Sequence, residues 1–567
     1  MKTLKKIISS ERGVALITMM LLLSALTLLA AGAMMVSSID LKLATNYYQN
    51  SRAFYAAEAG VEKALSDIQT ILDGQGTITD QDLNTVLPPE LDNFTFEEFK
   101  LERSAAPFVI TVNTGPYMGM VSLNQPINIT SKVIGPGNSR YHIMVSVEGL
   151  QIPIFQFGVF YDDSLQIHNG ASMDFIGRVH TNSSIFLGPG TTSSSVSSKF
   201  HRPITVAGDL YLKKIPSGDI NDQVFIDDPS GNSINLGMNP GQSSATYPGG
   251  DESWVAYTDG LFQGRLRTRA HNITPLGMPI PKTIDPIEII KRRNAGDEVA
   301  LRLERLDWKA DLRIYANAGL SSISIMDSTG NPKVLTNGNP SAVTSAIQPQ
   351  YNAFYDDREK DSVDLLIVYV NRLTAADIGN GIVYISIVEE SDRHKGIMLD
   401  SASTLPGPVS FVSDNAIYIR GNYNTGPPWR PSAVMADAVN LLSNAWKNAE
   451  NPKNHSPSPR AASTTTYYVA ILGGDTPNLP DYNGGLENFP RFLENWSGIN
   501  CNIVGSFINL WLSENADGDW SYGGPIYTAP GRNWSFDVRF LDFNQLPPGT
   551  PSVGSVLRIA FRQEFYE

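Results

Sequence analysis

Residues 11–39 read ERG-VALITMMLLLSALTLLAAGAMMVSSI, and this stretch determines how the chain is anchored and where its fold begins. Val14 to Ile39 contains no charged residue, and a basic leader with Lys2, Lys5, Lys6 and Arg12 precedes it. A helix needs about 20 apolar residues to cross a bilayer core of about 30 Å, so the run is long enough to span a membrane. Because Lys and Arg favour the cytoplasmic side, we expect the rest of the chain to lie outside the cytoplasm.

The helical pattern continues beyond the apolar run. Phe54, Val61, Leu65, Ile68 and Leu72 are spaced as one stripe of an amphipathic helix. The sequence therefore predicts one helix over residues 14–73. Val14, Leu22, Leu29 and Val36 mark its membrane half, and the stripe docks on a globular body. Val36-Ser37-Ser38 is a weak match to a secretory cleavage site, but the apolar run is long for a signal peptide and the helix does not stop there.

Two segments, Arg12-Gly13-Val14-Ala15-Leu16 and Ala53-Phe54-Tyr55-Ala56-Ala57-Glu58-Ala59, resemble the N-terminal region of PilX-type minor pilins, in the type IV pilin superfamily. The resemblance implies that residues 1–13 are a leader which a prepilin peptidase cuts after Gly13, methylating Val14. It implies other pilins or pseudopilins as partners. It also implies a single-pass location in the bacterial inner membrane, with the body in the periplasm, before passage to a pilus fibre or the cell surface.

One position departs from the pattern of major pilins, which carry Glu at the fifth mature residue to pair with a neighbour's N-terminal amine. Counted from Val14, that position is Thr18 here. A carboxylate in a bilayer costs roughly 2.5–3.5 kcal/mol on insertion scales unless it is paired, and Thr18 cannot make the pair. The absence of this Glu is typical of PilX-type chains and of the pseudopilin thought to cap type II secretion fibres. The departure favours a capping or initiating role.

Composition bounds the remainder of the chain. Its 567 residues are 42% hydrophobic and 18% charged, which describes a folded protein long enough for several domains. The net charge is −14, and it becomes about −17 without the basic leader. This balance argues against nucleic acid as a partner, because binding phosphates needs a basic footprint. It favours solubility, cation binding or a basic partner.

Alternating apolar residues predict a small antiparallel β-sheet laid against the helix, with strands over 94–102, 108–112, 127–133 and 143–147. From residue 151 onward the strands become very short. Three segments, 179–187, 206–212 and 412–419, repeat an apolar approach, a polar turn and an aliphatic-aromatic-aliphatic ending, as stacked rungs of a β-solenoid would. The irregular intervals between them leave an elongated β-sandwich open.

The predicted fold class is therefore α+β and mainly β. Its domains are the leader 1–13, the helix 14–73, a small β domain 93–150 and a large β-rich domain 151–567 with insertions. Apolar runs over 363–370 and 382–388 predict strands buried on both faces. Helical spacing predicts helices around Val299, Leu303 and Leu306, and over Ser432 to Trp446. The acidic, core-forming body also predicts a soluble monomer for a chain that begins at Asn93.

The search for chemistry yields no catalytic, cofactor or metal site. The seven histidines show no metalloprotease or Cys/His ligand spacing, and we expect His168 and His180 to be structural. Acidic pairs at 162–163, 227–228 and 356–357 read as turn or capping residues, and Cys501 reads as a buried thiol. Asn515, Asp517 and Asp519 resemble part of a calcium loop that lacks its bidentate Glu. We expect no enzyme and no cofactor.

The leading hypothesis is structural: a minor pilin or pseudopilin-like component of a type IV pilus or type II secretion fibre, at the tip or in the initiation complex. The alternative is a pilus-associated adhesin whose β body binds a glycan or a host polymer through exposed aromatic residues such as Trp429 or Trp496.

Overall fold

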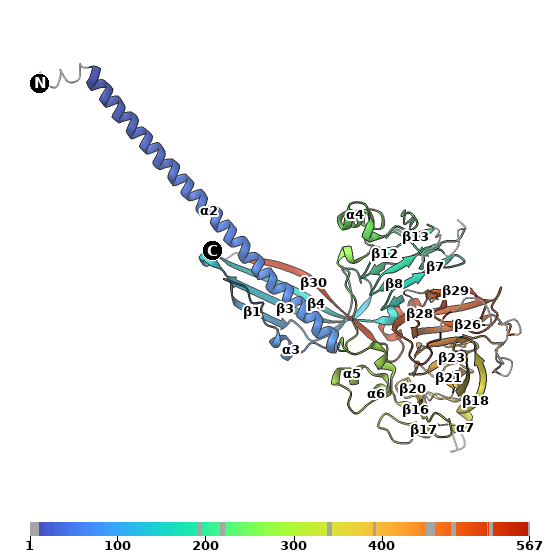
Figure 1. The fold of residues 1–567 in the computed structure, drawn as a ribbon. Helices are drawn as coiled ribbons and strands as arrows, with labels where there is room; N and C mark the ends of the chain where they lie inside the picture. The colour runs from blue at the N-terminus through green and yellow to red at the C-terminus, as the bar shows by residue number, and fades with distance from the viewer. Residues whose placement is uncertain are drawn as a thin grey trace.

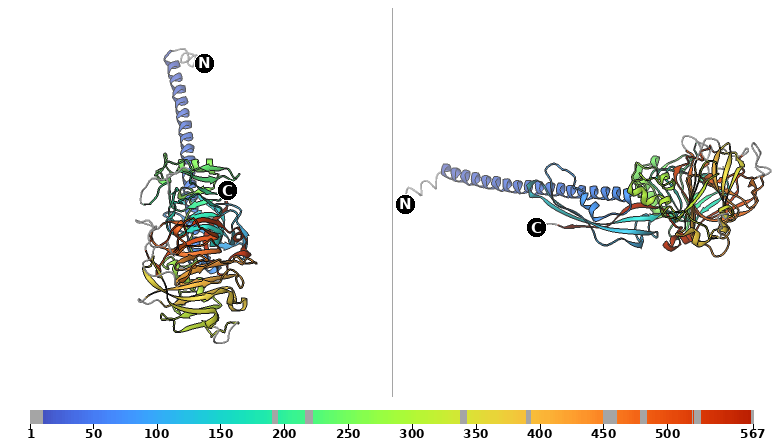
Figure 2. Two further views of the ribbon diagram at one scale, coloured as in Figure 1. Left: turned by 90° about the vertical axis from the view of Figure 1, so that its right-hand side faces the viewer. Right: turned by 90° about the horizontal axis from the view of Figure 1, so that it is seen from below.

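A long helix carries a small sheet along its second half and a large β-rich body beyond its end (Figures 1 and 2). The structure is a computed structural model that describes residues 11–189, 195–215, 222–336, 343–388, 393–448, 460–477, 484–518, 520 and 526–564. The basic residues Lys2, Lys5 and Lys6 lie outside the described residues. The predicted fold class, mainly β with a long N-terminal helix, is confirmed.

Helix α2 runs without a break over Glu11–Gln75, 65 residues, and is therefore roughly 98 Å long at 1.5 Å per residue. Gly76, with φ at 71°, follows its last residue and donates to the Leu72 carbonyl at 2.9 Å. A left-handed glycine after a helix satisfies a terminal carbonyl that no helical N–H reaches. The helix then ends against the sheet, because Gln125 accepts from the Ile78 N–H and donates to the Gly76 carbonyl.

The small sheet is antiparallel and has the order β1-β3-β4-β30, with β2 also paired to β3. Its strands are β1 (Thr95–Arg103), β2 (Phe108–Thr111), β3 (Val121–Ile134), β4 (Arg140–Pro153) and β30 (Ser552–Glu564). Buried residues alternate with partly exposed ones along most of β3 and β4. One face of the sheet therefore packs on α2, as the alternation in the sequence predicts.

The last strand of this sheet corrects the predicted domain boundaries. β30 pairs with β4 in register from Ser552↔Pro153 to Glu564↔His142. The segment 552–564 therefore belongs to the small sheet, and not to a domain running from 151 to 567. Residues far apart in the sequence complete one sheet, which a reading of consecutive segments cannot show.

The large body is a parallel β-solenoid, which answers the choice between solenoid and sandwich. Its main sheet has the order β15-β11-β8-β5-β28-β26-β24-β22-β20-β16-β17, with β29 also paired to β28. All of these neighbours are parallel except β16 and β17. The bounds are β5 (Phe157–Tyr161), β8 (Arg178–Thr181), β11 (Ile204–Val206), β15 (Leu266–Arg267), β16 (Leu312–Ala316), β17 (Ile323–Met326), β20 (Ile382–Ile387), β22 (Val409–Ser413), β24 (Ser432–Ala436), β26 (Thr465–Asp475), β28 (Asn500–Leu512) and β29 (Gly531–Phe536).

Three smaller sheets form the other sides of the solenoid. The first has the order β18-β19-β21-β23-β25-β27: β18 (Ile347–Asp356), β19 (Asp361–Tyr369), β21 (His394–Asp400), β23 (Ala416–Arg420), β25 (Val439–Leu442) and β27 (Arg491–Phe492). The second has the order β12-β9-β6: β12 (Leu210–Tyr211), β9 (Ile185–Leu187) and β6 (Leu165–Ile167). The third has the order β14-β13-β10-β7: β14 (Ser233–Asn235), β13 (Val224–Asp227), β10 (Ser198–Phe200) and β7 (Met173–Phe175).

The chain builds this solenoid from the middle. It enters at β5, winds out to β15, crosses to the opposite end at β16, and winds back until β28 lies beside β5. The register Phe507↔Val159 closes the two halves into one stack. Beyond β29 the chain returns to the small sheet as β30, so the body is joined to that sheet at both of its ends (Figure 1).

The repeated cadence in the sequence does mark stacked rungs. Segment 179–187 contains most of β8 and all of β9, and it lies directly under 206–212, with Thr181↔Val206 and Ile185↔Leu210 in register. At the turn between β11 and β12 the backbone passes so close to the rung below that a Cβ on Gly208 would lie 2.7 Å from the Ser183 carbonyl oxygen. Only glycine fits there.

The helix predicted over 432–446 is wrong. These residues form β24 and β25, two sides of one rung, and Ser432 to Ala436 pair in parallel with β22. All nine residues of the two strands are buried. An apolar run buried on every side has no amphipathic period, so its spacing does not distinguish helix from strand. The predicted strands over 363–370 and 382–388 are confirmed as β19 and β20.

Short helices fill the connections. The α-helices are α3 (Asp80–Thr85), α4 (Gly250–Phe262), α5 (Val299–Glu304), α6 (Leu306–Lys309), α7 (Val343–Ala346) and α8 (Ala375–Ile378). The helical spacing predicted around Val299 and Leu306 corresponds to α5 and α6. The 3-10 helices are η1 (Pro136–Asn138), η2 (Ile154–Gln156), η3 (Ser244–Thr246), η4 (Arg269–His271), η5 (Pro286–Ile290), η7 (Val370–Arg372), η9 (Leu486–Asn488), η10 (Val538–Leu541) and η11 (Phe543–Gln545).

Candidate functional site

The first half of α2 exposes a continuous apolar surface. Val14, Leu22, Leu29 and Val36 are 51%, 63%, 70% and 59% exposed. The helix contains a window of mean hydropathy 2.5, none of which is buried against the rest of the chain. In water such a surface is highly unfavourable. By length and composition this half suits a membrane span or a helix bundle.

Three hydroxyl groups of this half are satisfied within the helix itself. Thr18 Oγ1 donates to the Val14 carbonyl at 2.8 Å and to the Ala15 carbonyl at 3.0 Å. Ser24 and Thr27 bond back to carbonyls four residues earlier in the same way. Polar groups in lipid must find internal partners, and this arrangement provides them. Gly13 lies in the first turns of the same helix, next to Val14.

The second half of α2 packs on the small sheet. Of the predicted stripe, Val61, Ile68 and Leu72 are fully buried, while Phe54 and Leu65 are partly buried against the same cluster. The sheet side of this cluster comes from β3 and β4, including Ile127, Ile129, Val133, Ile143, Val145 and Val147. The five stripe residues therefore lie along one helix–sheet interface.

Small residues on α2 allow the helix to approach the sheet closely. They were not part of the predicted stripe, which contains only large residues. Ala53, Ala57 and Ala64 are completely buried. A Cβ on Gly60 would lie 2.7 Å from Phe96 Cε1 and 2.8 Å from Ser131 Oγ. Ser131 Oγ donates to the Ala57 carbonyl at 2.9 Å inside the interface. The signal is present in the sequence as small residues at helical spacing beside the stripe.

The C-terminal strand also fastens the helix. The Val556 N–H donates to Gln69 Oε1 at 3.0 Å, and Arg558 pairs with Glu62. Gly554 packs against Leu72, and a Cβ added to Gly554 would lie 3.0 Å from Leu72 Cγ. The docked half of α2 is thus held by strands from both ends of the chain.

The histidines occupy structural positions. His180 bonds to Thr205 Oγ1 at 2.8 Å and to Asn182 Oδ1 at 2.9 Å, and burial lowers its pKa to about 4. His168 bonds to the Gly188 carbonyl at 2.9 Å, and burial likewise lowers its pKa to about 4. Among the residues that the structure describes, no three His, Cys, Asp or Glu side chains are placed to hold a metal ion.

The acidic pairs at 227–228 and 356–357 form hydrogen bonds within the solenoid, and the cysteine is part of its core. Asp228 accepts from the N–H groups of a turn, and Asp356 accepts from the Arg358 N–H and from the Tyr418 hydroxyl. Asp227 bonds His201 at 2.7 Å. Cys501 is a completely buried thiol in β28, and burial raises its pKa.

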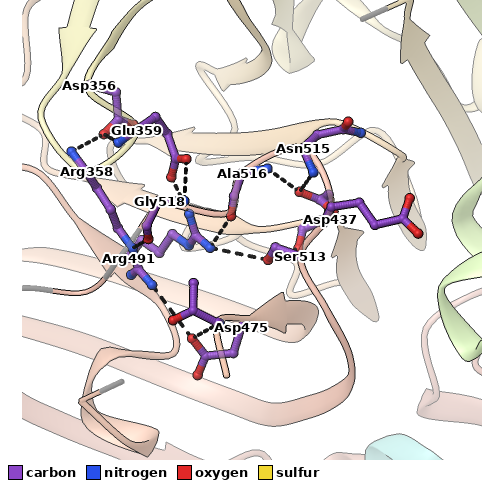
Figure 3. Close-up of polar contacts among 12 residues, drawn as sticks. Asp356, Arg358, Glu359, Asp437, Asp475, Arg491, Ser513, Asn515, Ala516 and Gly518 are labelled. Atoms are coloured by element: carbon purple, nitrogen blue, oxygen red, sulfur yellow. Dashed lines mark hydrogen bonds and ion pairs between the residues drawn. The ribbon is translucent and has the colours of Figure 1, made fainter. Parts of the chain in front are cut away.

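Figure 3 shows where the calcium-like segment lies. Asp437, completely buried, accepts from the N–H groups of Glu514, Asn515 and Ala516 at 2.7, 3.1 and 2.7 Å. Arg491 donates to the Ala516 carbonyl, and the Gly518 N–H donates to Glu359. These backbone N–H and C=O groups of the loop are therefore already bonded to side chains of the solenoid. Asp519 lies outside the described residues.

Helix α2 is thus bare in its first half and docked on the sheet in its second. Residues 12–62 match the family described as PilX N-terminal. The predicted resemblance is confirmed, and this region is type IV pilin-like. The match ends within the docked half of α2 and does not extend to the sheet or the solenoid.

The chain is similar to the competence-associated pilin ComZ from Thermus thermophilus, with 11% identity, a TM-score of 0.30, and coverage of 91% of this chain and 97% of that one. A search of the curated proteins found no match to the chain.

Proposed function

We propose that this chain is a large minor pilin or pseudopilin-like subunit, a structural and not an enzymatic component of a type IV pilus or type II secretion fibre. A prepilin peptidase cuts it after Gly13. The exposed half of α2 holds it in the inner membrane with the body in the periplasm, and later packs among the helices of other pilins.

The size of the solenoid beside the helix end supports a place at the tip or in the initiation complex. The main sheet has eleven strands along its path, which at about 4.8 Å per strand span about 48 Å. Helices that pack together lie about 8–10 Å apart. If every helix of a close-packed bundle carried a body this large, neighbouring bodies would collide. A copy at the end of the fibre has free space beyond it.

Two measurements test the proposal. Intact-mass analysis of the membrane-extracted protein should find Val14 at the N-terminus, methylated. Gly13→Asp should leave the leader attached, because the peptidase must reach a backbone that carries no side chain. A product that begins near Ser38 contradicts the pilin route and indicates ordinary secretion.

Location is tested separately, by labelling an epitope-tagged copy on sheared fibres. Label at one fibre end, in substoichiometric amount, supports the proposal. Label spaced along the whole fibre contradicts the terminal position while leaving the processing result intact.

The adhesin alternative gains no support from the two tryptophans that suggested it. Trp496 is completely buried, and Trp429 is half-buried beneath Arg539, whose Cζ lies 3.8 Å from the ring centroid. Trp496 therefore offers no face for stacking on a glycan, and one face of Trp429 is already covered by Arg539.

A further inference from the structure

An arginine-rich cleft opens where the solenoid meets the small sheet. Its volume is about 320 Å³, and its lining combines the β2–β3 loop around Met118, the starts of β8, β11 and β15, and η10. Arg178, Arg202, Arg265 and Arg267 line it, and no Asp or Glu is among its lining residues. In a chain of net charge −14, this is a local surplus of positive charge.

The solenoid register explains why the guanidinium groups gather here. Val179 pairs with Ile204 and Ile204 with Leu266, so Arg178 and Arg265 both immediately precede aligned core residues. Strands lie about 4.8 Å apart, which puts these two arginines about 10 Å apart on the same outer edge. Arg267 follows Arg265 by two residues and so faces the same side of β15.

Three of these arginines form no ion pair with a carboxylate in the described part of the chain, although Asp227 and Asp228 act on Arg265 at longer range. The side chains of Arg202, Arg265 and Arg267 make no hydrogen bond or ion pair with the described part of the chain, and Arg267 Nε is buried without a partner. Arg178 donates to the carbonyls of Pro116 and Met118, and to no carboxylate among the residues described.

The charges of Asp227 and Asp228 act on Arg265 and offset part of the lowering of its pKa by burial. Asp227 bonds His201, and Asp228 accepts from Ser230 and Asn232. Burial, followed by repulsion from Arg265 and Arg202, lowers the pKa of Arg178 to about 10. The guanidinium groups are held close together despite this burial and mutual repulsion. An anionic ligand that they bind in a bidentate manner would relieve both.

The rim of the cleft indicates what carries the negative charge. Met118, Ile176 and Val538 line it and are 57%, 40% and 56% exposed, so a ligand here gains by covering apolar surface as well. A long phosphodiester would meet the negative field of the rest of the chain. Lipid headgroups are distant, because the helix from Asp40 to Gln75 adds roughly 54 Å between the membrane and the cleft.

We propose that this cleft is a docking site for an acidic, partly apolar peptide segment of a partner protein, whose carboxylates pair with Arg202, Arg265 and Arg267. The proposal concerns a partner site on the body and is independent of where the subunit lies in a fibre.

The test uses the full chain in detergent and a fluorescein-labelled octapeptide of alternating glutamate and leucine, measured by fluorescence anisotropy. We expect saturable binding that weakens with salt. Arg202→Gln combined with Arg265→Gln should weaken it at least roughly tenfold, because each charge-assisted bond is worth that order of affinity. Arg140→Gln, on the small sheet away from the cleft, is the matched control and should change affinity less than about twofold.

Three further probes make the result decisive. The same peptide with glutamine in place of glutamate should not bind, and Val538→Ser should weaken the acidic peptide without changing the melting temperature. Absence of saturable binding, or binding that the double arginine variant leaves unchanged, overturns the proposal. Tighter binding of inorganic phosphate or of an eight-nucleotide thymidine oligomer also overturns it, in favour of a phosphate site.

Discussion

At the scale of single residues, the contact between α2 and the sheet depends on side chains that are small or absent. Gly60 lies against Phe96 and Ser131, and Ala57 contributes a carbonyl that Ser131 reaches. A larger residue at either position would separate the two surfaces and leave the Ser131 hydroxyl buried without its acceptor. Overpacking and unsatisfied polar groups each cost about 1–3 kcal/mol.

Gly60→Val should therefore destabilise the protein by about 1–3 kcal/mol. Gly32→Val is the matched control, because no atom lies within 4 Å of a Cβ at Gly32. Thermal unfolding in detergent, followed by tryptophan fluorescence, measures both. Equal midpoints for the two variants would show that the close approach at Gly60 does not matter.

Glu494 is a second residue-scale determinant. It is 1% exposed and accepts from Ser443 N–H and Oγ, both at 2.6 Å, and burial raises its pKa from 4.5 to about 7. The folded state therefore holds this proton more tightly than the unfolded chain. Its stabilising contribution is complete below about pH 4.5 and is lost as the pH rises to about 7.

Glu494→Gln should flatten the fall in unfolding free energy between pH 4.5 and 7, by up to about 3 kcal/mol. Glu252→Gln, on an exposed face of α4, should leave the slope unchanged. Denaturant unfolding at several pH values provides the measurement. A slope that Glu494→Gln does not alter would contradict the assignment.

At the scale of elements, α2 and β30 are parts of one packing unit with β3 and β4. The face that α2 covers contains Ile127, Ile129, Val133, Ile143, Val145 and Val147, each at most 1% exposed. The sequence-based expectation of a soluble monomer beginning at Asn93 treats the stripe as an accessory. The structure leads to the opposite expectation, because removing α2 exposes this whole face to water.

A chain that begins at Asn93 should aggregate or unfold at a lower temperature, whereas one that begins at Asn46 keeps the docked half of α2 and should be monomeric. Size-exclusion chromatography and thermal unfolding distinguish them. If both chains are monomeric with the same midpoint, the helix is not an essential part of this core.

At the scale of the whole molecule, a bare apolar half-helix is joined to a solenoid that the chain closes on itself. The bare half carries Thr18 at the position where the resemblance to pilins places the carboxylate of major subunits, and the Thr18 hydroxyl is already bonded within the helix. A neighbour's N-terminal amine would find no counter-charge here, and an unpaired charge in low dielectric is costly.

The chain should therefore be substoichiometric and should not polymerise alone, while Thr18→Glu should be tolerated or admit more copies into the fibre. Quantitative mass spectrometry of purified fibres measures the ratio to other pilins. Cysteine cross-linking between positions near Val14 and the fifth residue of neighbouring pilins tests the expected pairing of its amine. Fibres in which this chain is the dominant subunit would contradict the terminal role.

The sequence by itself determined what depends on local order. An uncharged run of 26 residues, the stripe from Phe54 to Leu72, and alternation in 127–147 specify the helix and the small sheet through periods of 3.6 and 2. The PilX-type motif and the repeated pattern at 179–187 and 206–212 could also be recognised in the sequence, because they too are local. Each pattern is complete within a few turns or strands.

Only the tertiary structure decided which distant segments meet. β30 joining β4, β28 closing on β5, and strands in place of a helix over 432–446 all depend on partners dozens to hundreds of residues away. The arginine cleft likewise exists because parallel register aligns Arg178 with Arg265 across an intervening rung. Segments buried on all sides, and charges gathered from separate rungs, carry no period along the chain, so their arrangement is fixed by packing alone.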